Sequence, residues 1–369
     1  MRVSNLHIQN YRNLAPQCLD LSFGLNIFAG NNAQGKTNLL ESIYLCASGR
    51  AKRAKHDREL VRFGELDAYV QLVVSHTEND VFPTQVDIHL RSDRPKGIAI
   101  NGIPIKKLSD LFGKLLCVIF TPEDLRLVKE GPAERRRFID MEMCQVSRVY
   151  VYHLQTYYHV LKQRNSLLKG LRGGRFAARQ LRDTISVWDE QLAEHGAKIF
   201  DERKKFIDNL GRAASEIHTR LTGHSEHLQI EYRPNIIPGE FAGKLASTLD
   251  RDISLGSTSI GIHKDDLYFA INGSDARTYG SQGQQRTAAL SAKLAQIEIM
   301  TALAGEPPVL LLDDVLSELD ESRQAHLMQS ISNLQAVITC TGVEDVIRKV
   351  SSAQSYDIFR IENGVVSLW

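Results

Sequence analysis

Hydrophobic and polar positions change their spacing several times along the chain, and each spacing predicts a different kind of element. Residues 26–30 form a short apolar run, and after a polar loop the apolar positions of 39–45 recur at helical spacing. Between 68 and 105 short segments alternate, and Asn101-Gly102, which favours a type I′ hairpin turn, separates the last two. We therefore predict a strand-loop-helix unit followed by an antiparallel meander.

The middle of the chain has the spacing of long helices. Apolar residues recur at intervals of three, four and seven at Leu154, Tyr158, Leu161, Leu168, Ile185, Trp188, Leu192 and Ile199. A glycine-containing break at 170–174 separates the two halves, so we predict an antiparallel helical hairpin. Two later apolar runs, 309–312 and 336–340, are typical of strands buried in a parallel sheet.

Together these elements predict an α/β fold, in which a head with a mixed sheet carries an inserted helical arm. We expect residues 1–134 and 231–369 to form the head, and residues 135–230 to form the arm. A chain of 369 residues is long enough for two or three domains of ordinary size.

One polar loop has the pattern of a phosphate-binding loop, and it lies between a predicted strand and a predicted helix. Its candidate nucleotide-binding residues are Gly30, Asn31, Asn32, Ala33, Gln34, Gly35, Lys36, Thr37 and Asn38. In this motif successive backbone N–H groups cradle phosphates, Lys36 neutralises the β- and γ-phosphates, and the Thr37 hydroxyl binds magnesium. A glycine-rich turn without a ligand is the alternative, and the strand-loop-helix setting disfavours it.

The apolar run 309–312 ends in two carboxylates, as a Walker B strand does. Asp313 would hold magnesium through water, and Asp314 would orient the water that attacks the γ-phosphate. An apolar run that ends in Asp is also common in ordinary core strands, so this assignment depends on the phosphate loop. ATP and Mg²⁺ are the expected cofactors, with Lys36, Asp313 and Asp314 as the catalytic residues and Thr37 and Asp313 as metal ligands.

A third polar segment, 279–287, precedes an apolar-periodic helix. Ser281, Gly283 and Gln284 are suited to binding a phosphate at the start of that helix. Ser281 is equally suited to capping the helix as a structural residue, and the sequence leaves both interpretations open.

Charge is balanced overall and uneven locally. The chain has 45 basic and 44 acidic residues, a formal charge of +1, which excludes a uniformly polybasic coat protein and a uniformly acidic tail. Six basic and two acidic residues lie between Arg50 and Arg62, so that this segment carries +4. Such a segment suits contacts with the phosphates of a nucleic acid, and Arg50, Lys52, Arg53 and Lys55 are the candidate DNA-binding residues.

A second basic group lies on the predicted hairpin, at Lys162, Arg164, Lys169, Arg172, Arg175, Arg179 and Arg182. For both groups a solvated surface is the alternative to DNA binding. The cluster of His263, Asp265 and Asp266 has metal-ligand chemistry, but such residues in a turn more often serve a structural role.

Several classes of protein are disfavoured. The longest apolar stretch, 115–120, is far shorter than the roughly 18 residues that span a membrane, and the first ten residues lack the apolar segment of a secretory signal. The five cysteines form no close pair, which disfavours a disulfide framework or a zinc site. We expect a cytoplasmic protein without a membrane partner.

The order of the motifs resembles the ATP-binding cassette (ABC) ATPases of the SMC/Rad50 type, in which a long insertion separates the phosphate loop from a signature loop. Against the signature L-S-G-G-Q, Ser281, Gly283 and Gln284 match, whereas Gly280 and Gln282 depart from it. Other stretches are similar to the RecF family, namely 10–13 (NYRN), 120–125 (FTPEDL), 135–140 (RRRFID), 261–266 (GIHKDD) and 313–320 (DDVLSELD).

This resemblance implies an ABC-type ATPase head that forms an ATP-dependent homodimer, with Ser281, Gly283 and Gln284 on the γ-phosphate of the partner subunit. It implies a protein of recombinational repair and replication-fork maintenance that binds duplex DNA or single-strand/double-strand junctions. With RecR and RecO proteins it would load RecA at gaps.

Two departures from the wider cassette pattern lead us to expect a slow, weakly DNA-stimulated ATPase. Asp314 replaces the usual glutamate, and no switch histidine follows the strand at 336–340, where Thr341 occupies either the switch position or a plain loop. The alternatives are an SMC-like chromosome organiser, for which the arm is too short, and a P-loop enzyme or transporter subunit unrelated to DNA.

Overall fold

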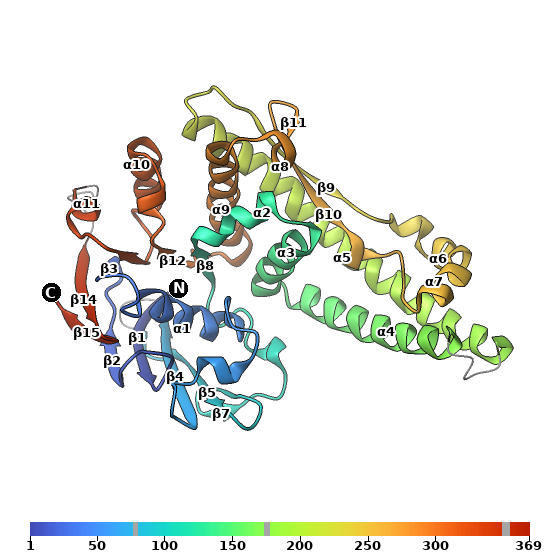
Figure 1. The fold of residues 1–369 in the computed structure, drawn as a ribbon, viewed down its shortest axis with the longest axis horizontal. Helices are drawn as coiled ribbons and strands as arrows, with labels where there is room; N and C mark the ends of the chain where they lie inside the picture. Colours follow the sequence, from blue (N-terminus) through green and yellow to red (C-terminus); the bar gives the residue numbers. More distant parts are fainter. Residues whose placement is uncertain (77–79, 173–177, 349–354) are drawn as a thin grey trace. The chain divides into compact units, whose positions relative to one another are not determined.

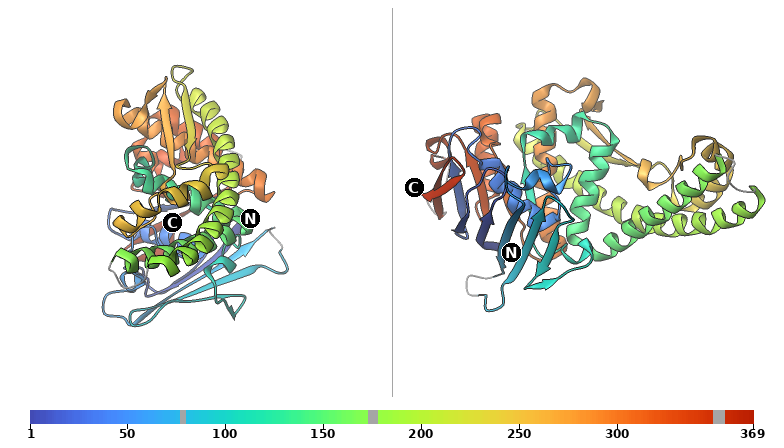
Figure 2. Two further views of the ribbon diagram at one scale, coloured as in Figure 1. Left: turned by 90° about the vertical axis from the view of Figure 1, so that its right-hand side faces the viewer. Right: turned by 60° about the horizontal axis from the view of Figure 1, so that its bottom comes forward.

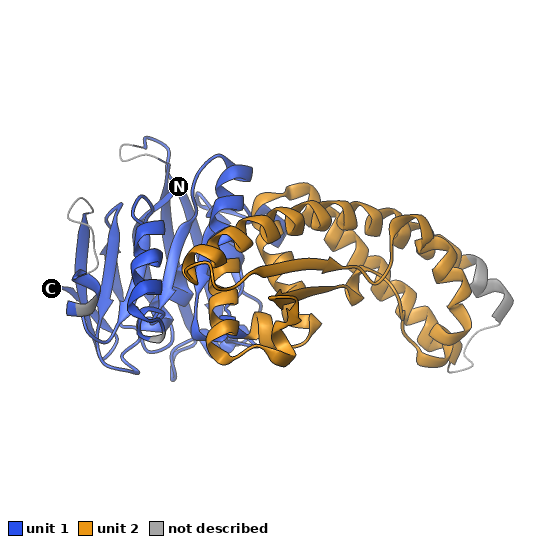
Figure 3. Ribbon diagram, turned by 90° about the horizontal axis from the view of Figure 1, so that it is seen from above, with its two compact units in different colours: residues 1–125, 293–369 blue, residues 126–292 orange. Residues whose placement is uncertain are grey.

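The computed structural model describes residues 1–76, 80–172, 178–348 and 355–369. Contacts divide the chain into two compact units (Figure 3), unit 1 of residues 1–125 and 293–369 and unit 2 of residues 126–292. The expected lobes, with boundaries near 134 and 230, stay a prediction about domain organisation.

Unit 1 is built around a mixed sheet whose inner strands are short, wholly buried and mostly apolar. Every residue of β3 (Leu25–Ala29), β12 (Val309–Asp313) and β13 (Ala336–Cys340) is buried, as expected for the centre of a parallel sheet. Within the described residues the order is β15 (Val365–Leu368), β14 (Tyr356–Glu362), β3, β13, β12 and β8 (Cys117–Phe120). Only β15 pairs antiparallel to its neighbour, and the strands predicted at 309–312 and 336–340 are confirmed.

A second, antiparallel sheet of unit 1 contains the predicted meander (Figure 1). Its order is β2 (Gln17–Asp20), β1 (Arg2–Gln9), β4 (Asp67–Ser75), β5 (Thr84–Arg91), β6 (Gly97–Ile100) and β7 (Ile103–Pro104). Asn101 and Gly102 have φ angles of 50° and 76°, as the second and third residues of a type I′ turn require.

The helices of unit 1 follow its strands. Helix α1 (Lys36–Ser48) begins directly after the phosphate loop, packs on β12 and β13, and ends at Gly49 in the left-handed conformation. The other helical elements are α10 (Glu321–Ser330), α11 (Glu344–Ile347), η1 (Asp57–Leu60), η2 (Leu108–Asp110), η3 (Pro122–Leu125) and η5 (Leu316–Glu318).

Unit 2 contains the predicted helical hairpin. Helices α4 (Arg148–Arg172) and α5 (Ala178–Leu221) pack along each other (Figure 2) and bury the periodic apolar positions Leu161, Leu168 and Leu192. The remaining elements are α2 (Arg126–Lys129), α3 (Pro132–Val146), β9 (Leu228–Arg233), α6 (Pro238–Ser247), α7 (Leu249–Leu255), η4 (Ile262–Lys264), β10 (Asp266–Ile271), β11 (Ser274–Asp275) and α8 (Ala276–Tyr279). Helix α9 (Gln282–Ala304) contains the boundary between the units.

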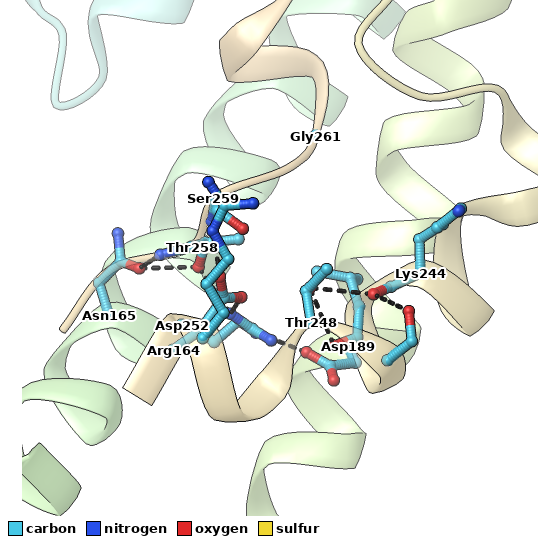
Figure 4. A network of polar contacts seen from close by, with 12 residues as sticks. Arg164, Asn165, Asp189, Lys244, Thr248, Asp252, Thr258, Ser259 and Gly261 are labelled. Atoms are coloured by element: carbon cyan, nitrogen blue, oxygen red, sulfur yellow. Dashed lines mark hydrogen bonds and ion pairs between the residues drawn. The ribbon is translucent and has the colours of Figure 1, made fainter. Parts of the chain in front are cut away.

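Arg164 corrects one expectation from the sequence, because its side chain is wholly buried and holds no DNA-facing position. Its guanidinium lies 2.6 Å from Asp189 and 2.7 Å from Asp252, and it donates to the Thr258 hydroxyl at 2.9 Å (Figure 4). A buried guanidinium must be neutralised and hydrogen-bonded, and these neighbours join α4, α5 and α7.

The rest of that basic group is only partly described. Lys162, Lys169 and Arg172 are exposed, whereas Arg175 and the side chains of Arg179 and Arg182 lie outside the described residues. Across the parts of the chain that the structure describes, no helix has both the length and the apolar character needed to cross a membrane.

Candidate functional site

The phosphate loop turns sharply between β3 and α1, and two glycines make the turn possible. A Cβ on Gly30 would lie 2.3 Å from the carbonyl oxygen of Ile361, and one on Gly35, whose φ is 113°, would lie 2.8 Å from the Leu14 side chain. Ala33 adopts a φ of 65° in the same loop. The loop therefore leads its backbone into the first turn of α1, where free N–H groups attract anions.

Lys36 lies inside the loop that precedes it. Its ammonium donates to the carbonyl oxygens of Gly30 at 2.5 Å and Asn31 at 3.1 Å, and its side chain is largely buried. Burial lowers the pKa of Lys36, while the nearby carboxylates of Asp314 and Asp313 act in the opposite direction. A partly desolvated ammonium in this position has a strong affinity for phosphate oxygens.

Asp313 joins the two nucleotide motifs that the sequence predicted separately. Its Oδ1 accepts a hydrogen bond of 2.9 Å from the Thr37 hydroxyl and one of 3.0 Å from the Thr339 hydroxyl. Burial raises the pKa of Asp313, and the two hydroxyls partly offset this effect. A hydroxyl and a carboxylate side by side are oxygen ligands of the kind that Mg²⁺ prefers, so these residues fit the expected metal.

Thr339 is a site residue that sequence reasoning missed. Besides donating to Asp313, its hydroxyl accepts a hydrogen bond of 3.0 Å from the backbone N–H of Asp314, which has a φ of 53°. Thr339 thus fixes the turn that carries both carboxylates. Thr341, the candidate switch residue, is exposed. One feature of the sequence signals this role. Thr339 lies near the end of the strand beside β12, opposite Asp313 at the same edge of the sheet.

Two of the candidate DNA contacts, Lys52 and Arg53, form ion pairs beside this site. Arg53 Nη2 is 2.9 Å from Glu123 Oε1 and 3.4 Å from Asp313 Oδ2, and Lys52 Nζ is 2.8 Å from Asp124 Oδ1. Burial opposes ionisation of Glu123, but the hydrogen bond and charge of Arg53 outweigh it and lower the pKa of Glu123.

Arg50 and Lys55, which are exposed as Arg53 is, by contrast form no ion pair within the described residues. The four basic residues therefore separate into two pairs with different surroundings. Glu123 and Asp124 belong to the stretch 120–125. This stretch is similar to the RecF family, but no site role was predicted for it.

The motifs of unit 1 line a common pocket with a volume of about 350 Å³. Side chains from the phosphate loop, the Walker B strand and the segment after α1 contribute, including Asn32, Lys36, Thr37, Arg53, Asp313 and Asp314. The lining has cations and a hydroxyl near two carboxylates, which suits a polyanion bound together with a divalent metal.

The signature segment belongs to unit 2. Ser281 caps the start of α9 there, which is the structural role that the sequence left open for it. The Ser281 hydroxyl oxygen accepts from the Gln284 N–H at 3.2 Å, and Gln284 Oε1 accepts from the Ser281 N–H at 2.9 Å, which forms a capping box. Local packing does not require a glycine at position 283, because a Cβ there would meet nothing nearer than the Ser281 hydroxyl at 3.9 Å. Ser281 and Gly283 are both exposed.

The cluster of His263, Asp265 and Asp266 has the structural role that was favoured for it. His263 Nδ1 lies 2.9 Å from the Tyr157 hydroxyl, and Asp266 forms an ion pair with Arg135 at 2.6 Å. Asp265 pairs with the wholly buried Arg203 at 2.8 Å. These contacts hold β10 and the turn before it on α3, α4 and α5.

Comparison with known proteins gives the same family as the motifs. The sequence profile of the family described as RecF/RecN/SMC N terminal domain matches residues 2–367. The chain is 43% identical over 366 residues to the DNA replication and repair protein RecF of Lachnoclostridium phytofermentans, with 99% of each chain covered. It is 45% identical over 369 residues to the RecF protein of Lachnospira eligens, again with 99% of each covered.

Solved structures agree with this result. The fold is similar to that of the recombination mediator protein RecF with ATP, with a TM-score of 0.89, 34% identity, and coverage of 100% of this chain and 97% of that one. An Smc head domain from Pyrococcus furiosus matches with a TM-score of 0.57 and 14% identity, covering 100% of this chain and 95% of that one. The second likeness shows a shared head fold.

Proposed function

Because this chain belongs to the RecF family and has the head fold of SMC-type ABC ATPases, we propose that it is an ATP-dependent DNA-binding protein of recombinational repair. The observation that carries the proposal is the hydrogen bond between Thr37 and Asp313, residues 276 positions apart. It brings a phosphate loop and a carboxylate strand to one pocket, as nucleotide binding with a divalent metal requires.

ATP binds through the loop amides and Lys36. The first amides of α1 face the phosphates, and the Lys36 ammonium exchanges its loop carbonyl partners for phosphate oxygens. Thr37 and Asp313 would hold Mg²⁺, which would supply positive charge beside the phosphates. RecF proteins with a bound nucleotide are known, which supports ATP as the ligand.

Hydrolysis is slow and times the release of DNA. Asp314 orients the attacking water, but its carboxylate is one methylene shorter than the glutamate of faster cassette enzymes. Arg53 lines the same pocket, so we assign it to the nucleotide and not to DNA. DNA held by the dimer stimulates this weak activity.

Two subunits join through ATP. Ser281, Gly283 and Gln284 contact the γ-phosphate that the partner subunit holds. The capping box supports this role, because Ser281 uses its oxygen to accept from Gln284 and keeps its own O–H free to donate. Gly283 supports it too, since an exposed helix position without neighbours has no need of glycine unless another molecule approaches closely.

The dimer binds duplex DNA or single-strand/double-strand junctions and acts with RecR and RecO to load RecA at gaps. The family membership supports these partners, since a related structure is that of a recombination mediator in the RecFOR pathway.

Size measurement with ATP and magnesium tests the proposal. The wild-type protein should dimerise only with nucleotide, Lys36→Met should stay monomeric, and Gly283→Glu should bind ATP normally without dimerising. A Lys36→Met protein that dimerises as well as the wild type would disprove the ATP-dependent dimer. Binding to gapped duplex, blunt duplex and single strand then identifies the preferred DNA.

A further inference from the structure

The last β-hairpin of the chain touches the phosphate loop. Strands β14 and β15 are joined by Asn363-Gly364, with φ angles of 51° and 78°. The N–H of Gly364 donates to the Gln34 carbonyl at 3.1 Å, and the N–H of Asn363 donates to Gln34 Oε1 at 2.6 Å. One residue of the phosphate loop is thus held by both its backbone and its side chain.

A segment near the start of the chain holds the loop from another side. Asn13 donates to the Ala33 carbonyl at 3.3 Å and accepts from the Asn38 side chain at 2.7 Å. Its own carbonyl oxygen would lie 2.0 Å from a Cβ on Gly364, so the turn and this segment are in close contact.

These contacts surround the part of the loop with the least favourable backbone. Ala33 and Gly35, the two neighbours of Gln34, have φ angles of 65° and 113°. Glycine adopts a positive φ readily, but for Ala33 this conformation costs free energy and persists only when surrounding contacts impose it. The loop binds phosphates only when its N–H groups point at them. Its affinity for a nucleotide is therefore reduced by the fraction of time that it spends in other conformations.

We propose that Gln34 and the Asn363-Gly364 turn are positioning residues, which hold the phosphate loop in its binding conformation before the nucleotide arrives. The inference rests on the proposed function of the same loop in ATP binding. The β14–β15 hairpin is then part of the nucleotide site, although neither Asn363 nor Gly364 lines the pocket.

The chain contains a matched control for this proposal. Asn101-Gly102 forms the same kind of turn, and Gly102 has a φ of 76°, close to the 78° of Gly364. A Cβ on Gly102 meets nothing within 4 Å, whereas one on Gly364 meets Asn13. Gly102→Ala and Gly364→Ala therefore introduce similar backbone strain, and only Gly364→Ala displaces the contact with the loop.

The experiment measures ATP affinity and, without nucleotide, hydrogen exchange of the amides at 31–37. Gly364→Ala should lower ATP affinity about tenfold and speed exchange in the loop, while Gly102→Ala changes neither. If Gly364→Ala fails to fold, Gln34→Ala removes only the side-chain acceptor and should show the same effects in weaker form.

Equal loop exchange and equal ATP affinity in all these proteins would overturn the positioning role. A wild-type protein that binds no ATP would overturn the proposed function instead. The exchange measurement still decides the positioning role in that case, because it needs no nucleotide.

Discussion

The hydroxyl of Thr37 donates a hydrogen bond of 2.9 Å to Oδ1 of Asp313, across 276 positions of sequence. Asp313 also accepts a hydrogen bond of 3.0 Å from Thr339 and lies 3.4 Å from Arg53, yet burial raises its pKa above that of an ordinary carboxyl. The folded protein thus keeps a carboxylate where its charge is costly. A bound cation offsets this cost, so the charge of Asp313 should matter for metal binding more than for stability.

Asp313→Asn should therefore lose the magnesium-dependent part of ATP affinity. We expect ATP affinity with Mg²⁺ to fall about tenfold or more, towards its value in a chelator, while the melting temperature stays the same or rises. Asp314→Asn is the matched control, because Asn tolerates the same left-handed backbone and this residue is assigned to hydrolysis. A normal response of Asp313→Asn to magnesium would refute its role as a ligand.

The sequence predicted the two motifs that meet at Thr37 and Asp313, because each motif depends on a local pattern. Glycines at fixed spacing specify the loop, and an apolar run ending in carboxylates specifies the strand. The meander, its Asn101-Gly102 turn and the helical hairpin were predictable for the same reason. Each follows from a periodicity or a turn preference that lies within a short stretch of chain.

Arg164 shows where such local patterns fail. Its position among basic residues indicated a surface role, yet the side chain is wholly buried between Asp189 and Asp252. These partners lie 25 and 88 positions away, and no periodicity relates them. The ion pairs of Lys52 with Asp124 and of Arg53 with Glu123 were not predictable from local patterns either, because these carboxylates come from a distant segment.

Arg164→Ala should strongly destabilise unit 2, since it leaves two carboxylates buried without their cation. We expect a loss of about 3–5 kcal/mol in the free energy of unfolding. Trp188 in α5, next to Asp189, provides a fluorescence probe for urea unfolding in a Trp369→Phe background. The exposed Lys162→Ala is the control and should change stability by less than about 0.5 kcal/mol. Equal effects of the two changes would contradict the buried network.

His263 should make stability depend on pH. The Thr258 carbonyl can only accept, so Nε2 of His263 donates to it at 3.2 Å and Nδ1 accepts from Tyr157. Burial lowers the pKa of His263 from 6.5 to about 4. Between these values the unfolded chain binds a proton that the folded chain does not, so stability present above pH 6.5 is lost as the pH falls towards 4.

Replacing His263 with Gln should remove this dependence, because Gln offers a donor and an acceptor but does not titrate. Between about pH 7 and pH 5 the wild-type protein should lose about 2 kcal/mol more unfolding free energy than His263→Gln. Urea denaturation at a series of pH values measures the difference. Parallel stability curves for the two proteins would mean that His263 takes up its proton in the folded state.

Among the four predicted DNA contacts, Arg50 and Lys55 remain available for DNA, because both are exposed and neither forms an ion pair within the described residues. Arg50→Glu with Lys55→Glu should weaken DNA binding at low salt. If each residue contacts one phosphate, the slope of log affinity against log salt should fall by about 2. ATP affinity should stay unchanged, whereas substitutions of Lys52 or Arg53 would disturb the nucleotide pocket as well.

A control with the same change in net charge separates a local contact from a general electrostatic effect. Lys244→Glu with Arg251→Glu alters exposed residues of α6 and α7 in unit 2. This variant should keep the salt slope, because side chains that contact no phosphate release no counterions from the DNA. If both double variants reduce the slope equally, DNA contacts are not confined to the segment after α1. If only the control reduces it, the DNA surface belongs to unit 2.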